Sequence, residues 1–167
     1  MKYQRPTKAV IAAAGFGTRF LPQTKAMPKE MLPIIDKPII QYIVEELVEA
    51  GIKDIIIVTG HNKRSIEDHF DAPTADLAAT LANGGKGPAL ARLHEIANMA
   101  NFIYIRQKEA LGNAGPLLYA GHLINDGEPF IYTWGDDFIG AEPSRFKQMI
   151  TAYEQTKGSI VSCVPVH

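Results

Sequence analysis

The chain has 167 residues, of which 46% are hydrophobic and 21% are charged, and its formal net charge is −1. This composition is ordinary for a globular protein with one core, and the near-zero charge excludes a general electrostatic attraction to nucleic acid or to an acidic membrane. No apolar run approaches the roughly 18 residues that a membrane span needs. The single cysteine, Cys163, excludes an internal disulfide, so we expect a cytoplasmic protein. From the charge and the short apolar runs, we expect neither a nucleic-acid nor a membrane partner.

The first third of the chain predicts a strand, a loop, a helix and a second strand. Lys8–Ala13 is a short apolar run closed by glycine, which is typical of a buried parallel strand. Between Pro38 and Gly51, apolar residues recur at helical spacing and predict an amphipathic helix: Ile39, Ile40, Ile43, Val44, Leu47 and Val48. Asp54–Gly60 is a second apolar run, so a right-handed parallel crossover is expected.

Helices and strands continue to alternate through the rest of the chain. Helices are predicted over residues 63–70, 74–85, 88–100, 114–124 and 143–158. Strands are predicted over Asn101–Gln107, Pro129–Phe138 and Ser159–Val166, and Cys163 is expected to be a small core residue of that last strand. This alternation indicates one α/β domain, residues 1–167, with a mainly parallel sheet covered by helices on both faces. Because the sequence stops directly after an apolar strand, we expect a C-terminally truncated fragment.

A glycine-containing loop follows the first strand, in the stretch AAAGFGTRFLPQTKAMPKEMLP of residues 12–33. Gly15 and Gly17 leave room for backbone N–H groups to approach phosphate oxygens. Phe20 stands where a dinucleotide fingerprint has its third glycine, and no GK[ST] of a P-loop is present. A nicotinamide-binding oxidoreductase domain is therefore disfavoured.

The charges around this loop are all positive. Residues 1–29 contain no Asp or Glu. Arg19 and Lys29 supply a guanidinium and an ammonium, which together suit the distributed charge of a triphosphate. Lys25 is equally well explained as a solvated loop charge.

Two further strand ends carry polar residues, and ligands of open α/β sheets bind at the carboxyl ends of the strands. Asp136 and Asp137 close an apolar strand, and because adjacent side chains point to opposite sides, only one can face a ligand directly. Such a carboxylate is a natural ligand for Mg²⁺ bound together with phosphates, whereas Asp137 could instead cap the following turn. Gln107 can hydrogen-bond the edge of a base, and Gly112 allows close approach to a ring.

The stretch AAGFGTRFLPQTKAMPKEMLPIIDKPIIQYIVEEL resembles the opening of bacterial UTP:glucose-1-phosphate uridylyltransferases, which are sugar-nucleotide pyrophosphorylases. The pattern GxGTRxLPxTKxxPKEMLP is intact, and the segment LANGGKGPALARLHEIANMANFIYIRQ is similar to the helical insert of that branch. The resemblance covers essentially the whole chain. It implies a Rossmann-like, mixed but mainly parallel sheet of the nucleotide-diphospho-sugar transferase type, with UTP and glucose 1-phosphate as substrates.

The resemblance also implies roles for individual residues. Contacts with the uracil and ribose are implied for Ala13, Ala14 and Gly15, with the phosphates for Gly17, Thr18 and Arg19, and with the uracil edge for Gln107 and Gly112. Arg19 and Lys29 would be the catalytic cations, with Lys29 neutralising charge at the transferring phosphoryl group. Glu30 of the PKEMLP motif would bind substrate, and Asp136 would bind the Mg²⁺ cofactor. A homo-oligomer is expected for the full-length protein.

Two departures from the family pattern stand in the sequence. Where the family commonly has LGLGHA, this chain has LGNAGP, with Ala114 in place of a glycine and Pro116 at the next helix start. The family also continues well past His167, into a sugar-binding portion with a further catalytic lysine and a second metal-binding aspartate. Two alternatives therefore stay open: a non-catalytic nucleotide-binding fragment, and a nucleotidyltransferase for another nucleoside triphosphate or sugar phosphate.

Overall fold

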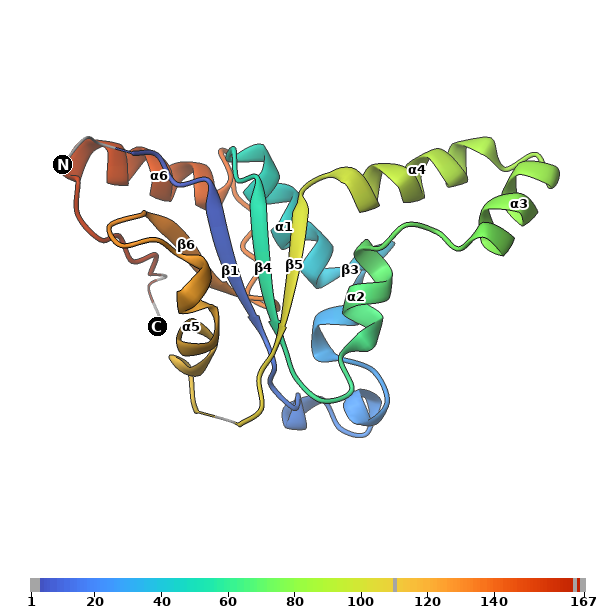
Figure 1. Cartoon of the computed structure of the whole chain (residues 1–167), viewed down its shortest axis with the longest axis horizontal. Helices are drawn as coiled ribbons and strands as arrows, with labels where there is room; N and C mark the ends of the chain where they lie inside the picture. The colour runs from blue at the N-terminus through green and yellow to red at the C-terminus, as the bar shows by residue number, and fades with distance from the viewer. Residues whose placement is uncertain (1–3, 110, 164, 166–167) are drawn as a thin grey trace.

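The computed structural model describes residues 4–109, 111–163 and 165, and its centre is a four-stranded parallel sheet (Figure 1). The strand order is β5-β4-β1-β6, with the bounds β1 Lys8–Ala13, β4 Asp54–Thr59, β5 Asn101–Arg106 and β6 Phe130–Trp134. A small antiparallel hairpin pairs β2, Pro33–Ile34, with β3, Lys37–Pro38. The helices are α1 Ile39–Glu49, α2 Arg64–Phe70, α3 Ala75–Asn83, α4 Gly87–Asn98, α5 Gly115–Ala120 and α6 Arg145–Thr156. Sequence and structure therefore agree on an α/β fold with a mainly parallel sheet.

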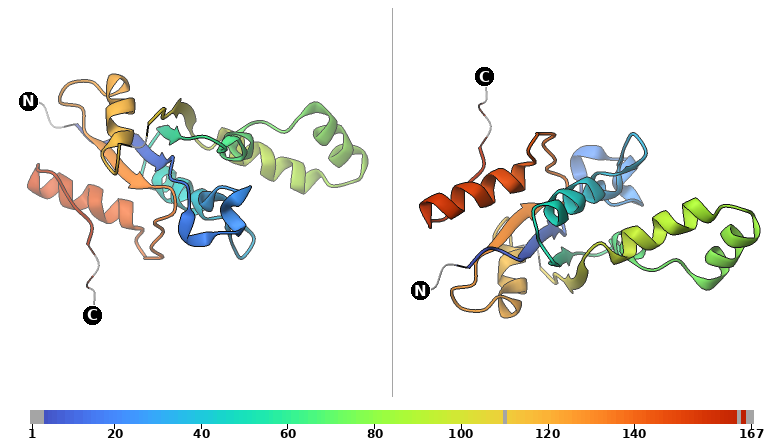
Figure 2. Two further views of the ribbon diagram at one scale, coloured as in Figure 1. Left: turned by 90° about the horizontal axis from the view of Figure 1, so that it is seen from below. Right: turned by 90° about the horizontal axis from the view of Figure 1, so that it is seen from above.

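Helices cover both faces of the sheet, as predicted (Figure 2). On one face, Ala9 and Ile11 of β1 belong to a core cluster that also includes residues of α1, α2, α4 and α6. On the other face, Val10 packs in a smaller cluster with residues of α5. Because β1 is covered on both sides, its residues are apolar without alternation, which is why it reads as a continuous hydrophobic run.

Helix α1 shows how the helical pattern becomes a buried face. Its apolar residues Ile40, Ile43 and Leu47 are completely buried against the sheet. The helix ends at Glu49, and Gly51 follows with a φ of +95°, a conformation that favours glycine. Replacing one of these buried residues by alanine would cost about 2–5 kcal/mol of unfolding free energy.

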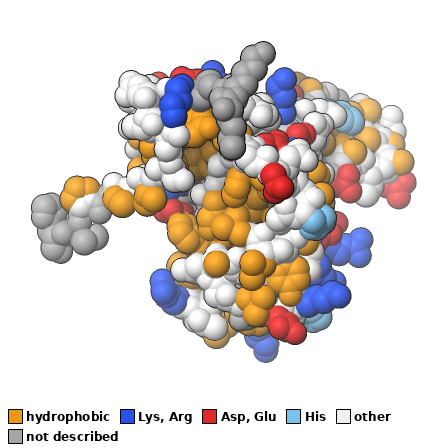
Figure 3. All heavy atoms as spheres, turned by 60° about the vertical axis from the view of Figure 1, so that its left-hand side comes forward, with side chains coloured by type: hydrophobic (Ala, Val, Ile, Leu, Met, Phe, Trp, Pro, Cys, Tyr) orange, Lys and Arg blue, Asp and Glu red, His pale blue; other side chains and the backbone are white. Residues whose placement is uncertain are grey.

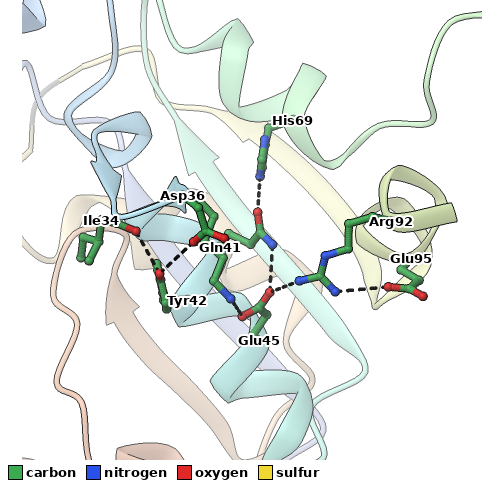
Figure 4. A network of polar contacts seen from close by, with 9 residues as sticks. Ile34, Asp36, Gln41, Tyr42, Glu45, His69, Arg92 and Glu95 are labelled. Atoms are coloured by element: carbon green, nitrogen blue, oxygen red, sulfur yellow. Dashed lines mark hydrogen bonds and ion pairs between the residues drawn. The ribbon is translucent and has the colours of Figure 1, made fainter. Parts of the chain in front are cut away.

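Helices α3 and α4 form an arm that projects from the body of the domain (Figures 1 and 2). Helix α3 has no buried residue, and α4 buries only Ile96 among its residues. A polar network ties the base of the arm to α1 (Figure 4). In it, Glu45 accepts hydrogen bonds from Gln41 Nε2 at 2.8 Å and from Arg92 Nη2 at 3.2 Å, while His69 Nε2 lies 2.9 Å from Gln41 Oε1.

The C-terminal segment differs from the sequence prediction. No strand is present among the described residues of the segment predicted over Ser159–Val166, of which Val164 and Val166 lie outside the described part of the chain. Val161 is 80% exposed, and Cys163 is exposed rather than buried in a core. The prediction was wrong because an apolar run becomes a strand only when a neighbouring strand pairs with it, and the apolar pattern alone does not supply that neighbour.

Strand β6 therefore forms one edge of the described sheet. Beside it lies an open cavity of about 650 Å³ whose walls come mainly from β6, α6 and residues 158–162. Hydrophobic side chains gather around a hollow on this side of the molecule (Figure 3). Among the described residues, no helix is both long and apolar enough to cross a membrane.

Candidate functional site

Four loops meet at the carboxyl edge of the sheet, where the sequence predicted the ligand site. The register pairs Ala13 with Thr59 and Thr59 with Arg106, and Gly135 N donates to Ala12 O at 3.0 Å. The loops that begin at residues 14, 60, 107 and 135 therefore lie side by side. A Cβ added to Gly60 would stand 2.8 Å from the carbonyl oxygen of Ala14, so only glycine lets the first two loops touch.

The glycine loop is held from within. Gly17 has a φ of +67°, and its carbonyl oxygen accepts a hydrogen bond of 2.7 Å from the buried hydroxyl of Thr24. A Cβ on Gly15 would lie 3.5 Å from Lys29 Cε, which shows that the Lys29 side chain runs directly along the loop. Arg19 is exposed on the short 3₁₀ turn Thr18–Phe20 and makes no ion pair with the described residues.

The structure brings Lys29 and Asp136 together, although they are 107 positions apart in the sequence. Lys29 Nζ donates to Asp136 Oδ2 at 2.7 Å, and the side chains are 21% and 28% exposed. An incoming phosphate could take the cation of this pair as its own partner, and the carboxylate would then be free to bind a metal ion. Such a partly exposed pair is therefore suited to binding a charged ligand.

Glu30 lies beneath this pair and has no exposed surface. Its Oε2 accepts a 2.6 Å hydrogen bond from Lys63, which is 5% exposed at the start of α2. Burial raises the pKa of the Glu30 carboxyl above its ordinary value, and the charge and hydrogen bond of Lys63 oppose that rise. A Cβ on Gly135 would lie 3.0 Å from Glu30 Cγ, so this glycine gives the buried side chain its space. Substrate contact by Glu30 stays a prediction. In the structure, the Glu30–Lys63 pair is a buried support for the segment that carries Lys29.

Asp136 and Asp137 follow β6, which ends at Trp134, so they lie in a turn and not in the strand predicted to reach Phe138. Asp137 has a different partner from Asp136. Its Oδ2 accepts a 2.8 Å hydrogen bond from Arg145 Nη1 at the start of α6. Arg145 is 8% exposed and also donates from Nη2 to the Asp137 carbonyl oxygen at 2.5 Å and to Thr133 Oγ1 at 3.3 Å. The two adjacent aspartates are thus paired with different cations on opposite sides of the turn.

The loop after β5 carries the residues predicted to read a base. Gln107 Nε2 donates to Glu109 O at 2.5 Å, and Gln107 Oε1 is buried without a partner among the described residues. Gly112 has a φ of +72°. The hydroxyl of Tyr132 on β6 donates to Asn113 O at 2.5 Å, which fastens this loop to the sheet.

The remaining predicted residues take ordinary places around the same edge. Ala13 is the buried last residue of β1, Ala14 is half-buried, and Gly15 and Thr18 are exposed. Sequence reasoning missed the buried Lys63 and Arg145 as well as the contact made by Gly60. The glycine at the end of the run Asp54–Gly60 was the available signal for the last of these.

A metal at this site would have a single protein carboxylate. In the described part of the chain, no group of three or more His, Cys, Asp or Glu side chains could hold a metal ion. Asp136 fits the needs of Mg²⁺, which takes one or two carboxylates and completes its coordination with water and phosphate oxygens. It does not fit a metal that needs a complete cage of protein ligands.

Comparison with known proteins decides the family. A family model described as nucleotidyl transferase matches residues 8–167. The chain belongs to the nucleotidyl transferase family. The match confirms that the sequence resembles this family.

Individual relatives of this chain are uridylyltransferases by name. It is 56% identical over 147 residues to UTP–glucose-1-phosphate uridylyltransferase YngB of Bacillus subtilis, which covers 88% of this chain and 49% of that protein. A second B. subtilis uridylyltransferase is 54% identical over 154 residues, 92% of this chain and 52% of the relative.

Two solved structures share its fold. A UTP-bound UGPase from Acinetobacter baumannii superimposes with a TM-score of 0.84 at 36% identity, over 91% of this chain and 54% of that one. A UDP-glucose pyrophosphorylase complexed with UDP-glucose gives 0.75 at 44% identity, over 91% and 55%. The chain therefore spans about half the length of the relatives that it matches.

Proposed function

We propose that this chain is the nucleotide-binding part of a UTP:glucose-1-phosphate uridylyltransferase. The contact between Lys29 and Asp136 beside the glycine loop supports the proposal, because a triphosphate bound by that loop would need both a cation and a Mg²⁺ ligand nearby. The loop after β5, which contains Gln107, lies along the same edge of the sheet. The names of the relatives favour UTP and glucose 1-phosphate over other substrate pairs.

The proposed reaction is an in-line displacement. An oxygen of the sugar phosphate forms a bond to the α-phosphorus of UTP, the bond between that phosphorus and the bridging oxygen breaks, and pyrophosphate leaves with the electron pair. The nucleophile is already an anion, so no general base is needed. Catalysis then consists of positioning the two substrates and reducing the repulsion between their negative charges.

The residues of this chain divide that work. The backbone of the glycine loop and the exposed Arg19 would hold the phosphates, and Lys29 would leave Asp136 to neutralise charge at the transferring group. Mg²⁺ held by Asp136 together with substrate phosphates would supply further charge neutralisation. Gln107 Oε1 is buried and has no hydrogen-bond partner among the described residues, so it could accept from the imide N–H of uracil.

Two finer features of the proposal concern the whole protein. The relatives are about twice as long, so we expect turnover to require the portion that the matched half lacks. We also propose that the full-length protein is a homo-oligomer in the cytoplasm. The exposed Cys163, without a second cysteine in these 167 residues, fits a reducing compartment.

Calorimetric titration of the 167-residue chain tests the proposal. UTP with Mg²⁺ should bind more tightly than CTP or NAD, and Gln107→Ala should remove the preference for UTP over CTP because the hydrogen bond to the base is lost. Gln148→Ala is the matched control, since Gln148 is exposed on α6 and bonds only Pro143 O. Preferential binding of NAD, or UTP affinity equal to that of CTP in the unsubstituted chain, would overturn the assignment.

A second experiment addresses the non-catalytic alternative. Pyrophosphate release from UTP and glucose 1-phosphate is measured for the chain and for a version extended to the length of its relatives. Release by the extended protein alone supports an enzyme of which this chain is one half. UTP binding without release by either protein favours a nucleotide-binding module.

A further inference from the structure

The turn that presents Asp136 is held from two sides. On the side of β1, Gly135 N bonds Ala12 O, and the backbone of Gly135 lies against the buried Glu30 side chain. On the far side, the Arg145 guanidinium bonds Thr133 before the turn and Asp137 after it. Asp136 stands between these two attachments and faces Lys29.

Arg145 occupies an unfavourable position for a cation. It is the first residue of α6, and the N-terminus of a helix carries positive partial charge. Its side chain is also 8% exposed, and Nε is buried without a hydrogen-bond partner among the described residues, although the guanidinium charge also interacts with Glu46. A buried cation at a helix N-terminus is retained only if its contacts compensate, and here three of them converge on residues 133–137.

We infer that Arg145 is a positioning residue for the proposed transfer reaction, because it fixes the turn at residues 134–137 so that Asp136 faces Lys29 and the phosphates. The two N–H donors on Nη1 and Nη2 bracket the turn, bonding the side chain and carbonyl of Asp137 and the hydroxyl of Thr133. Arg145 itself touches no substrate in this role. The inference rests on the proposed function only for the identity of the ligand that Asp136 meets.

The fluorescence of Trp134 can be used to monitor the conformation of the turn. Trp134 is the only tryptophan in the sequence, it immediately precedes Gly135, and it is 40% exposed. Its fluorescence therefore follows the turn in the ligand-free protein. In Arg145→Met, which keeps much of the side-chain volume and removes all three bonds, the acrylamide quenching constant of Trp134 should rise roughly twofold as the turn opens.

The second readout is the Mg²⁺ dependence of UTP binding. The apparent dissociation constant for Mg²⁺ should rise about tenfold in Arg145→Met, because residues that orient a metal ligand typically affect metal affinity by that order. UTP affinity without Mg²⁺ should be unchanged. Arg145→Lys keeps the charge but cannot bond on both sides of the turn. Its apparent dissociation constant for Mg²⁺ should therefore lie between those of the unsubstituted chain and Arg145→Met.

Lys147→Met is the matched control, because Lys147 is on the same helix and pairs with Glu49 away from the turn. It should change neither readout. A folded Arg145→Met protein with unchanged quenching overturns the inference, and so does increased quenching with unchanged Mg²⁺ dependence. If the unsubstituted chain fails to bind UTP, the proposed function falls while the quenching comparison still judges whether Arg145 holds the turn.

Asp137→Asn keeps the inference testable if Arg145→Met does not fold. The Asp137 side chain is 47% exposed, so the substitution is sterically mild and weakens one of the three bonds. The quenching constant should then shift in the same direction by a smaller factor. No shift in this folded variant would contradict the role assigned to Arg145.

Discussion

Replacing Lys63 by methionine would leave the Glu30 carboxylate buried without its cation. The two side chains are 5% and 0% exposed and are joined by a 2.6 Å contact. Removing one partner of such a pair typically costs about 3–5 kcal/mol, because the remaining charge is neither paired nor hydrated. With a urea dependence of about 2 kcal/mol per molar, the unfolding midpoint of Lys63→Met should fall by about 2 M at pH 8.

The loss should depend on pH in a defined direction. Burial already raises the pKa of Glu30 above its ordinary value of 4.5, and Lys63 opposes this, so removing Lys63 raises the folded-state pKa further. Above pH 4.5 the folded variant then holds a proton that the unfolded chain releases. Its stability therefore falls as the pH rises toward the new folded-state pKa, and the difference from the unsubstituted chain should be smaller at pH 5 than at pH 8.

Urea unfolding followed by circular dichroism at both pH values measures these differences. The double variant Glu30→Gln with Lys63→Met should recover much of the loss, since it buries no charge. Lys147→Met serves as control because its partner Glu49 is 54% exposed, and it should change the unfolding free energy by no more than about 1 kcal/mol. An equal loss at pH 5 and pH 8, or no recovery in the double variant, would refute the reasoning.

Two further predictions concern the carboxyl edge. In a protein extended to the length of its relatives, Lys29→Ala or Asp136→Ala should lower turnover by orders of magnitude, measured as pyrophosphate release; near-normal turnover in either would contradict their roles. Gly60→Ala should lower the unfolding free energy by about 1–3 kcal/mol, because its Cβ would meet Ala14 O at 2.8 Å. Gly121→Ala, where a Cβ meets nothing within 4 Å, should be neutral or slightly stabilising in the same urea titration.

The sheet and the position of its ligand edge could be predicted from the sequence. Continuous apolar runs such as Lys8–Ala13 are dictated by burial on both faces, and parallel strands necessarily bring their following loops to one edge. That rule is enough to place the loops of Lys29 and Asp136 together. Their direct contact, however, depends on side-chain geometry that spacing does not encode.

The buried cations could not be predicted. Lys63 and Arg145 each stand at the start of a helix in a polar stretch, where a charged residue ordinarily faces water. They are buried because acceptors from other parts of the fold meet them: Glu30, 33 positions away, for Lys63, and Thr133 and Asp137 of the turn after β6 for Arg145. The error over Ser159–Val166 has a related cause, since strand formation depends on a partner that the local pattern does not identify.

The α3–α4 arm carries an exposed turn that lies away from the candidate site. The turn at residues 84–86 is exposed, and the arm leads into the start of β5, at the opposite edge of the sheet from the glycine loop (Figure 1). Exposed tips of this kind tolerate insertions. A peptide tag placed between Gly84 and Gly85 would let the molecule be immobilised with the carboxyl edge of its sheet facing the solution.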